Sequence, residues 1–132
     1  MKEVDVVVGI VLKDDKFLVE RREPDEKVDP GIVCLPGGHV KTGESMEEAL
    51  KREMREELGI EVKGLKFICE NFYVASNGER QNAYCFLVTE YKGKPVCKSA
   101  QEIFWENNIE NLDLEVDRKT IMKVRGLIDI PK

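Results

Sequence analysis

Apolar and polar positions alternate along the first part of the chain in a way that predicts β-strands. Residues 4–12 are rich in β-branched side chains, and residues 16–21 alternate between apolar and polar types. Two aspartates between these segments are typical of a turn, so the N-terminus is predicted to be a β-hairpin. The following segment 23–31 contains prolines and glycine and predicts a surface loop before a short apolar strand at 32–35.

The clearest helix prediction covers residues 45–58. Ser45 is a suitable N-cap, and Glu48 three residues later completes a capping box. Apolar residues then recur every four positions, and Gly59 is placed to end the helix. In front of this helix, Pro36-Gly37-Gly38 predicts a tight backbone turn.

Elements of both kinds continue to the end of the chain. The later predictions are two long strands at 62–75 and 82–91 joined by a turn at 76–78, a short strand at 103–105, a linker at 107–111 and an amphipathic helix at 116–127. This order predicts an α/β fold, a sandwich with helices on both faces of a mixed β-sheet. No repeat or linker divides the chain, so residues 1–132 are interpreted as one domain.

Composition narrows the range of partners. The chain has 132 residues, of which 42% are apolar, and this is enough for one hydrophobic core. Its net charge of −5 and its lack of a basic cluster argue against duplex nucleic acid or a membrane surface as partner. The uncharged stretches are too short to span a bilayer and the N-terminus lacks a signal peptide, so a cytoplasmic location is predicted. A small anionic molecule bridged by a metal ion remains compatible with the charge.

The four cysteines are Cys34, Cys69, Cys85 and Cys97. They are widely spaced, form no C-x-x-C pair and lie mostly in apolar surroundings. We interpret them as reduced thiols, mostly buried, rather than as a disulfide framework or a zinc site.

Candidate chemistry lies on the predicted helix, where Glu53, Glu56 and Glu57 occupy positions i, i+3 and i+4. At about 100° per residue these carboxylates share an arc of roughly 100°. Such crowding is locally unfavourable unless a cation offsets it, and Mg²⁺ prefers oxygen ligands. On these three residues alone, a solvated surface helix is the favoured interpretation.

The segment in front of the predicted helix favours the metal-binding interpretation over a solvated surface helix. Residues 38–60 resemble the Nudix box, a pattern that consists of Gly, five residues, Glu, seven residues, Arg-Glu, an aliphatic residue, any residue, Glu-Glu, any residue, Gly and an aliphatic residue. Its fixed positions are filled here by Gly38, Glu44, Arg52, Glu53, Glu56, Glu57 and Gly59. The one departure is Met54 at a position that is usually Ile, Leu or Val. The strands before the box and the later Glu102-Ile103-Phe104-Trp105 also look like parts of a Nudix domain, so the resemblance extends nearly end to end.

The resemblance implies a mechanism and a set of metal ligands. Glu53, Glu56 and Glu57 would bind a divalent metal, usually Mg²⁺ and sometimes Mn²⁺, with a backbone carbonyl of Gly37 or Gly38. The metal would clamp a diphosphate and activate a water molecule for attack at phosphorus.

The resemblance also implies supporting roles for other residues. Arg52 would orient a glutamate, and Glu44 would act as a supporting group outside the metal ligands. Glu56, Glu53 and Glu102 are the candidates for the general base, although Glu102 is equally well interpreted as a surface charge. Arg21 and Arg22 follow the second predicted strand, where they would meet substrate phosphate or simply be solvated.

The substrate is predicted only as a class. Short length and simple architecture look most like the MutT-type members, which hydrolyse nucleoside triphosphates, including oxidised ones. An ADP-ribose or nucleoside diphosphate-sugar pyrophosphatase is the alternative enzyme, and a non-catalytic nucleotide-sensing Nudix module is the alternative from another class. The expected partner is a small-molecule nucleotide, and the expected assembly is a monomer or homodimer.

Overall fold

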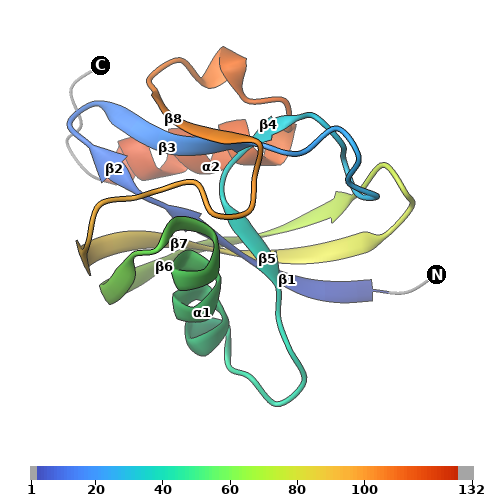
Figure 1. Cartoon of the computed structure of the whole chain (residues 1–132), viewed down its shortest axis with the longest axis horizontal. Helices are drawn as coiled ribbons and strands as arrows, with labels where there is room; N and C mark the ends of the chain where they lie inside the picture. The colour runs from blue at the N-terminus through green and yellow to red at the C-terminus, as the bar shows by residue number, and fades with distance from the viewer. Residues whose placement is uncertain (1–2, 128–132) are drawn as a thin grey trace.

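The computed structural model describes residues 3–127 and shows two β-sheets between two helices (Figure 1). The helices are α1 (Met46–Leu58) and α2 (Glu115–Leu127), with a short 3₁₀ helix η1 (Ile109–Asn111) before α2. The strands are β1 (Glu3–Ile10), β2 (Leu12–Lys13), β3 (Lys16–Arg21), β4 (Val33–Cys34), β5 (Gly37–His39), β6 (Glu61–Val74), β7 (Arg80–Lys92) and β8 (Glu102–Glu106). The predicted helices and the strands after the first are present with small changes at their ends, whereas the first predicted strand is divided in two.

The first sheet has the order β5-β1-β7-β6 and is mixed, as predicted. Strand β1 runs parallel to β7 and antiparallel to β5, while β6 and β7 form a long antiparallel pair. In the second sheet β3 pairs antiparallel with β2, β4 and β8. The two sheets meet near the fully buried Val11, where the chain leaves β1 and begins β2.

The predicted N-terminal hairpin is wrong for most of its length. Only β2 pairs with β3, through Leu12 opposite Phe17 and Lys13 opposite Lys16. Strands β5 and β7 occupy the two edges of β1, so β3 cannot pair with it and lies in the other sheet. The segment predicted as one strand is therefore two strands that belong to different sheets.

The predicted tight turn at Pro36-Gly37-Gly38 is also wrong. Gly37 and Gly38 begin strand β5, with Gly38 opposite Val7 and Gly37 opposite Val8 of β1. Neither glycine has a positive φ angle. What these positions require is space, because a Cβ on Gly37 would overlap the backbone carbonyl of Val7.

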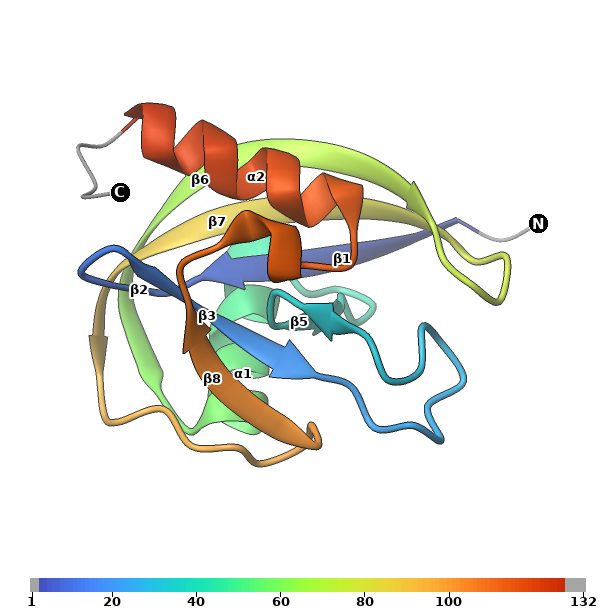
Figure 2. The same ribbon diagram turned by 90° about the horizontal axis from the view of Figure 1, so that it is seen from above.

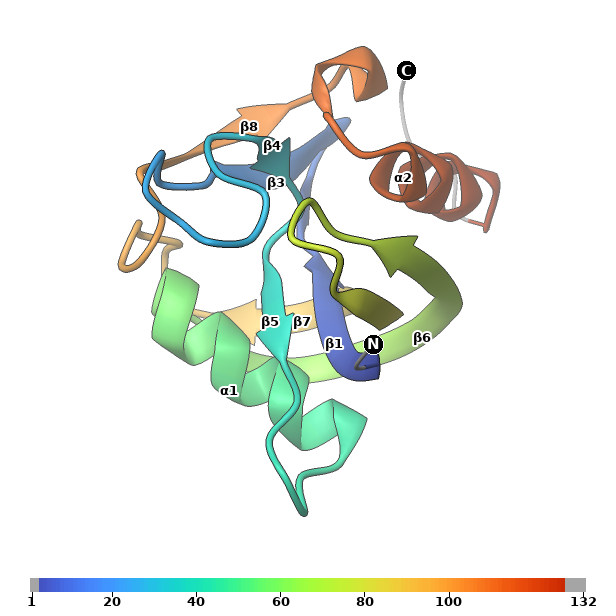
Figure 3. The ribbon, with the colours of Figure 1, turned by 90° about the vertical axis from the view of Figure 1, so that its right-hand side faces the viewer.

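Two hydrophobic cores lie on opposite faces of the first sheet. Alternation along β7 shows this directly, since Phe86 and Val88 pack in the core that contains α1, while Cys85 and Leu87 pack in the core that contains α2. Figure 3 shows the two helices on opposite sides of the strands, and Figure 2 shows α2 lying along β6. The predicted α/β/α sandwich is confirmed.

Helix α1 is fixed at both ends. The Ser45 hydroxyl accepts a hydrogen bond from the Glu48 N–H at 3.1 Å, and the Glu48 carboxylate accepts one from the Ser45 N–H at 2.8 Å. Gly59 ends the helix in the left-handed conformation with φ of 68°. Beyond it, the Lys98 N–H donates to the carbonyl of Glu57 at 3.0 Å, so the loop after β7 closes the C-terminal end. These contacts set the rotation of the helix, and thereby the direction of its glutamates.

The cysteines, all within the described residues, are free thiols. Cys34 and Cys85 are buried as predicted and Cys69 is half-buried, whereas Cys97 is exposed because it lies in the loop between β7 and β8. Neither helix in residues 3–127 is long and apolar enough to cross a membrane.

Candidate active site

Residues of α1, β3 and β5 surround one acidic cavity of about 400 Å³. Helix α1 contributes carboxylates and Arg52, β3 contributes Glu20, and β5 contributes backbone. The cavity is lined by Glu20, Arg22, Glu26, Gly37, Gly38, His39, Lys41, Arg52, Glu53, Glu56, Glu57, Ser99 and Ala100. Glu53, Glu56 and Glu57 of α1 therefore line one cavity together with Glu20.

Three of the carboxylates, those of Glu20, Glu53 and Glu57, are largely shielded from solvent. Glu20 is 3% exposed and Glu53 is 9% exposed, and the Glu57 carboxyl lies within hydrogen-bonding reach of both. Burial, together with the neighbouring Glu20 carboxylate, raises the pKa of Glu57 to about 11, and burial also raises the pKa of Glu20. The Oε2 atom of Glu20 is buried and has no hydrogen-bond partner among residues 3–127. Such an arrangement is unfavourable by itself and suits a cation.

Arg52 connects this cluster to the loop before the helix. Its Nε donates to Glu44 Oε2 at 2.7 Å and its Nη2 donates to Glu44 Oε1 at 2.9 Å. Its Nη1 lies 3.3 Å from Glu53 Oε1 and 3.1 Å from Glu56 Oε1, and Nη2 also reaches the carbonyl of His39 at 2.9 Å. The Arg52 side chain and the N–H of Lys41 lower the pKa of Glu44 to about 2.

Strand β5 passes directly beneath Glu53. A Cβ on Gly38 would overlap both carboxylate oxygens of Glu53. The glycine therefore allows the carboxylate to pack against the strand backbone, which explains why a residue without a side chain occupies this position.

The donor set fits a hard divalent cation. It consists of carboxylate oxygens from Glu20, Glu53, Glu56 and Glu57, and the buried unpartnered oxygen of Glu20 offers a further lone pair. Within residues 3–127, no three acidic, histidine or cysteine side chains are placed so that they could hold a metal ion as they stand. Arg52 contacts the Oε1 atoms of both Glu53 and Glu56, so it competes with a cation for one oxygen of each carboxylate.

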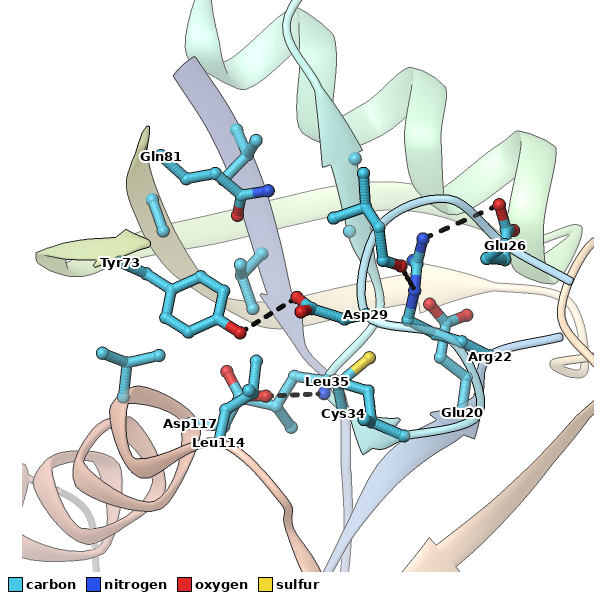
Figure 4. A pocket seen from close by; sticks show the side chains of 18 of the residues that line it. Glu20, Arg22, Glu26, Asp29, Cys34, Leu35, Tyr73, Gln81, Leu114 and Asp117 are labelled. Carbon is cyan, nitrogen blue, oxygen red and sulfur yellow. Dashed lines mark hydrogen bonds and ion pairs between the residues drawn. The ribbon is translucent and has the colours of Figure 1, made fainter. Parts of the chain in front are cut away.

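A second cavity of about 490 Å³ adjoins the first (Figure 4). The two share the lining residues Glu20, Arg22, Glu26, Gly37, Gly38 and His39. Its wall is largely apolar, and this volume is typical of sites for small organic ligands. The lining residues include Val6, Val8, Val28, Ile32, Leu35, Ala83, Leu114 and Val116, with polar groups from Asp29, Tyr73, Gln81 and Asp117.

Two hydrogen-bonded pairs shape this second cavity (Figure 4). The Tyr73 hydroxyl donates to Asp29 Oδ2 at 3.0 Å, which ties the loop after β3 to strand β6. The Leu35 N–H donates to Asp117 Oδ2 at 3.1 Å, which ties β4 to α2. Complete burial raises the pKa of Asp117 to about 7. The cavity thus combines an apolar wall with convergent polar groups.

The predicted site residues are only partly brought together. Glu44, Arg52, Glu53, Glu56, Glu57 and Gly38 gather around the acidic cavity, and Arg22 lines both cavities. Arg21 and Glu102 lie elsewhere, because they face each other across β3 and β8 and form an exposed ion pair at 3.0 Å. Neither of these two lines either cavity.

Sequence reasoning missed Glu20 and Asp117. Glu20 did carry a signal, since it is an acidic residue that ends the buried run Phe17, Leu18 and Val19 of β3. Asp117 carried none, because an acidic residue in the first turn of a helix is ordinary.

Comparison with known proteins gives concordant matches. A family model described as the NUDIX domain matches residues 3–115. The 8-oxo-dGTP diphosphatase of Buchnera aphidicola subsp. Schizaphis graminum (strain Sg) is 30% identical over 107 residues, covering 80% of this chain and 78% of that protein. The CTP pyrophosphohydrolase of Escherichia coli (strain K12) is 31% identical over 105 residues, covering 80% and 76%. The crystal structure of a MutT NUDIX hydrolase from Burkholderia pseudomallei superposes with a TM-score of 0.82 at 24% identity, covering 94% of this chain and 99% of that chain.

Proposed function

This chain belongs to the Nudix family, and on that premise we propose that it is a pyrophosphohydrolase that cleaves the diphosphate linkage of a nucleoside triphosphate. The observation that carries the proposal is the junction of two cavities. One is lined by the glutamates of α1 and by Glu20, and the other has a largely apolar wall with convergent polar groups. An acidic, metal-binding end suits a polyphosphate, and an adjoining apolar end suits a nucleoside.

The family generally uses a divalent metal, and we propose Mg²⁺, with Mn²⁺ as a substitute. Glu53, Glu56, Glu57 and the backbone of Gly38 would hold it, with Glu20 beside them. When bound, such a cation neutralises phosphate oxygens and lowers the pKa of a water molecule. Its charge would also reduce the repulsion among the buried carboxylates, which Arg52 offsets only through its contact with Glu53.

The chain's own residues would position the reactants. Arg52 holds Glu44 and the two glutamates on its own helix, so it sets the direction of the acidic face. Arg22 lies where the two cavities meet and would donate a hydrogen bond to a phosphate oxygen. Among the candidate bases we favour Glu56, because its side chain lines the acidic cavity yet is 52% exposed, so it can reach a water molecule. Glu102 is less suitable because it pairs with Arg21 outside both cavities.

A nucleoside triphosphate is the proposed substrate class, and an oxidised deoxynucleotide is a specific candidate. The relatives that support this class are named for 8-oxo-dGTP and for CTP, which differ in the base. In this chain Gln81 and Asp117 offer polar groups to the edge of a base inside the second cavity. We further propose that residues 1–132 form one domain, that it works in the cytoplasm, and that it is a monomer or homodimer.

The test is metal-dependent hydrolysis across a panel of substrates. Purified protein is incubated with nucleoside triphosphates, oxidised nucleotides, ADP-ribose, nucleotide sugars and dinucleoside polyphosphates, with Mg²⁺ or with EDTA, and phosphorus products are identified. Replacing an outer-shell group of a metal site usually costs about 10–100-fold, so Glu57→Gln should reduce turnover by at least about 100-fold. Glu47→Gln, an exposed glutamate on the same helix, is the matched control.

Two results would overturn the proposal. Preferential hydrolysis of ADP-ribose or a nucleotide sugar would replace the triphosphate as substrate class. No turnover of any substrate, with nucleotide binding retained in both the wild type and Glu57→Gln, would identify a non-catalytic sensing module instead.

A further inference from the structure

Two cysteines stand opposite each other on the long β6–β7 pair, away from the acidic cavity. Cys69 on β6 is the direct partner of Cys85 on β7. A shift in register between Phe67 and Cys69 creates this pairing, because regular pairing from Phe67 opposite Phe86 would place Ile68 opposite Cys85. Directly opposed residues point to the same face of a sheet, so both side chains face α2.

The two sulfur atoms share one polar environment beneath α2. The hydroxyl oxygen of Thr120 lies 3.7 Å from the Sγ of Cys69 and 3.8 Å from the Sγ of Cys85. The Asn71 side chain donates to Thr120 Oγ1 at 2.9 Å and lies 3.6 Å from the Cys85 sulfur. The Thr120 hydroxyl in turn donates to the carbonyl of Val116 at 2.8 Å. Both thiols therefore lie beside the same hydroxyl, on directly opposed residues of the strand pair.

The two thiols differ in exposure and acidity. Cys69 is half-buried at the sheet surface, whereas Cys85 is 1% exposed. Hydrogen bonds from Cys85 and Thr120, together with the nearby Lys123, lower the pKa of Cys69 to about 6. The adjacent Cys69 sulfur and burial raise the pKa of Cys85. Accessible thiolates are the reactive form of cysteine, so the geometry distinguishes an attacking sulfur from a resolving one.

We propose that Cys69 and Cys85 form a redox-active dithiol that a hydroperoxide oxidises to a cross-strand disulfide. The Cys69 thiolate attacks one oxygen of hydrogen peroxide, the O–O bond breaks, and sulfenic acid and hydroxide result. The Cys85 sulfur then attacks the Cys69 sulfur, the S–O bond breaks, and the leaving hydroxide takes the Cys85 proton. Two thiols and one peroxide thus give one disulfide and two waters, with two electrons passing from sulfur to oxygen.

The sheet geometry accommodates the product. Directly opposed residues in antiparallel strands have Cα separations of about 4.5–5.5 Å, which lie within the range of about 4.4–6.8 Å found in disulfides. The neighbouring contacts of Thr120 to both sulfurs would change on bond formation, and Thr120 lies one turn from Asp117 on α2. The Cys69–Cys85 disulfide would therefore lie next to α2, the helix that lines the second cavity. The proposal of this disulfide does not depend on the proposed function.

The test treats the reduced full-length protein with increasing hydrogen peroxide. Remaining thiols are then alkylated in denaturant, and intact mass and peptide maps are recorded. The expected result is a mass decrease equal to two hydrogens, loss of alkylation at Cys69 and Cys85, and a cross-link between their peptides. Cys97→Ser, which removes the exposed cysteine outside the pair, should give the same disulfide.

Two variants separate the roles of the sulfurs. Cys85→Ser should accumulate sulfenic acid at Cys69, detected as a dimedone adduct, whereas Cys69→Ser should form neither disulfide nor adduct at Cys85. Circular dichroism confirms that each variant is folded, and the wild-type peptide map does not depend on either variant. The proposal is overturned if Cys69 and Cys85 stay fully alkylatable while Cys34 or Cys97 is oxidised, or if wild-type Cys69 stops at sulfenic acid.

Discussion

The Arg52 guanidinium donates two hydrogen bonds to the Glu44 carboxylate, from Nε at 2.7 Å and from Nη2 at 2.9 Å. Its third nitrogen, Nη1, reaches Glu53 and Glu56. One side chain therefore ties the loop before α1 to the acidic face of the helix. A planar guanidinium can make these contacts together because its donors are fixed in a fork, which a lysine ammonium cannot reproduce.

Arg52→Lys should keep the charge but lose the shared orientation of Glu44, Glu53 and Glu56. We expect kcat/KM to fall by about 10–100-fold, as is usual for groups that orient metal ligands. Steady-state kinetics with varied Mg²⁺ will show whether the loss includes a higher metal requirement. Arg55→Lys makes the same change at an exposed position on this helix, and an equal loss in both variants would contradict the orienting role.

Glu20→Gln should separate stability from metal binding. It replaces a buried carboxylate, whose Oε2 has no partner in the described part of the chain, with a neutral amide that can donate to Glu57. We expect the metal-free protein to unfold at a higher temperature, while its affinity for Mn²⁺ falls by about 10–100-fold. Thermal unfolding in EDTA and calorimetric titration with Mn²⁺ measure the two effects.

The control for this change is Glu47→Gln, which removes a charge from an exposed position of α1. It should alter neither quantity. Unchanged Mn²⁺ affinity in Glu20→Gln would show that Glu20 is a structural carboxylate outside the metal site.

Gly38→Ala should damage the site more than the fold. Its new Cβ would meet the Glu53 carboxylate, which is the movable end of a side chain, whereas a Cβ on Gly37 would meet the fixed backbone of Val7. We expect Gly38→Ala to lower Mn²⁺ affinity by at least about tenfold with a small change in stability. Gly37→Ala should instead destabilise the fold by about 3 kcal/mol.

Urea unfolding and Mn²⁺ titration of both variants test this contrast. Gly126→Ala, where a Cβ would meet no other element of the described part of the chain within 4 Å, is the control and should change stability by no more than about 1 kcal/mol. Retained Mn²⁺ affinity in Gly38→Ala would show that the position of Glu53 beside β5 is not needed.

Local signals explain which elements could be predicted. The capping box at Ser45 and the glycine at position 59 act within a few residues, so α1 was located nearly to its ends. The pairing of β1 with β5 and β7 depends on residues far apart in the sequence, so the change of sheet at Val11 left no local signal. The same holds for Gly37 and Gly38, which resemble a turn unless their strand partner is known.

The candidate site divides in the same way. The glutamates of α1 and Arg52 share one helix, so their spacing indicated a common face. Glu20 reaches that face from β3, and Asp117 reaches the second cavity from the far helix, so only the folded arrangement brings them together. Arg21 and Arg22 are neighbours in sequence, but Arg21 pairs with Glu102 whereas Arg22 lines both cavities, a difference that their sequence positions do not show.

Asp117 is buried, and its carboxyl accepts a hydrogen bond from the Leu35 N–H at 3.1 Å. Burial raises its pKa from 3.8 to about 7 in the folded protein, so the folded state holds a proton that the unfolded state loses at lower pH. Stability from this group is fully present below about pH 4 and is lost as pH rises through about 7. The two pKa values imply a loss of about 4 kcal/mol across this window.

Asp117→Asn should remove this dependence, because an amide stays neutral and can still accept from the Leu35 N–H. We expect the variant to gain stability relative to the wild type as pH rises from about 4 to about 8, by up to about 4 kcal/mol. Urea unfolding of both proteins across this range, in EDTA, gives the difference directly. Asp113→Asn changes an exposed carboxylate bonded to the Val33 N–H at 2.7 Å and controls for the loss of a charge. A difference between wild type and Asp117→Asn that stays constant with pH would mean that Asp117 ionises equally in the folded and unfolded states, and that burial does not govern its charge.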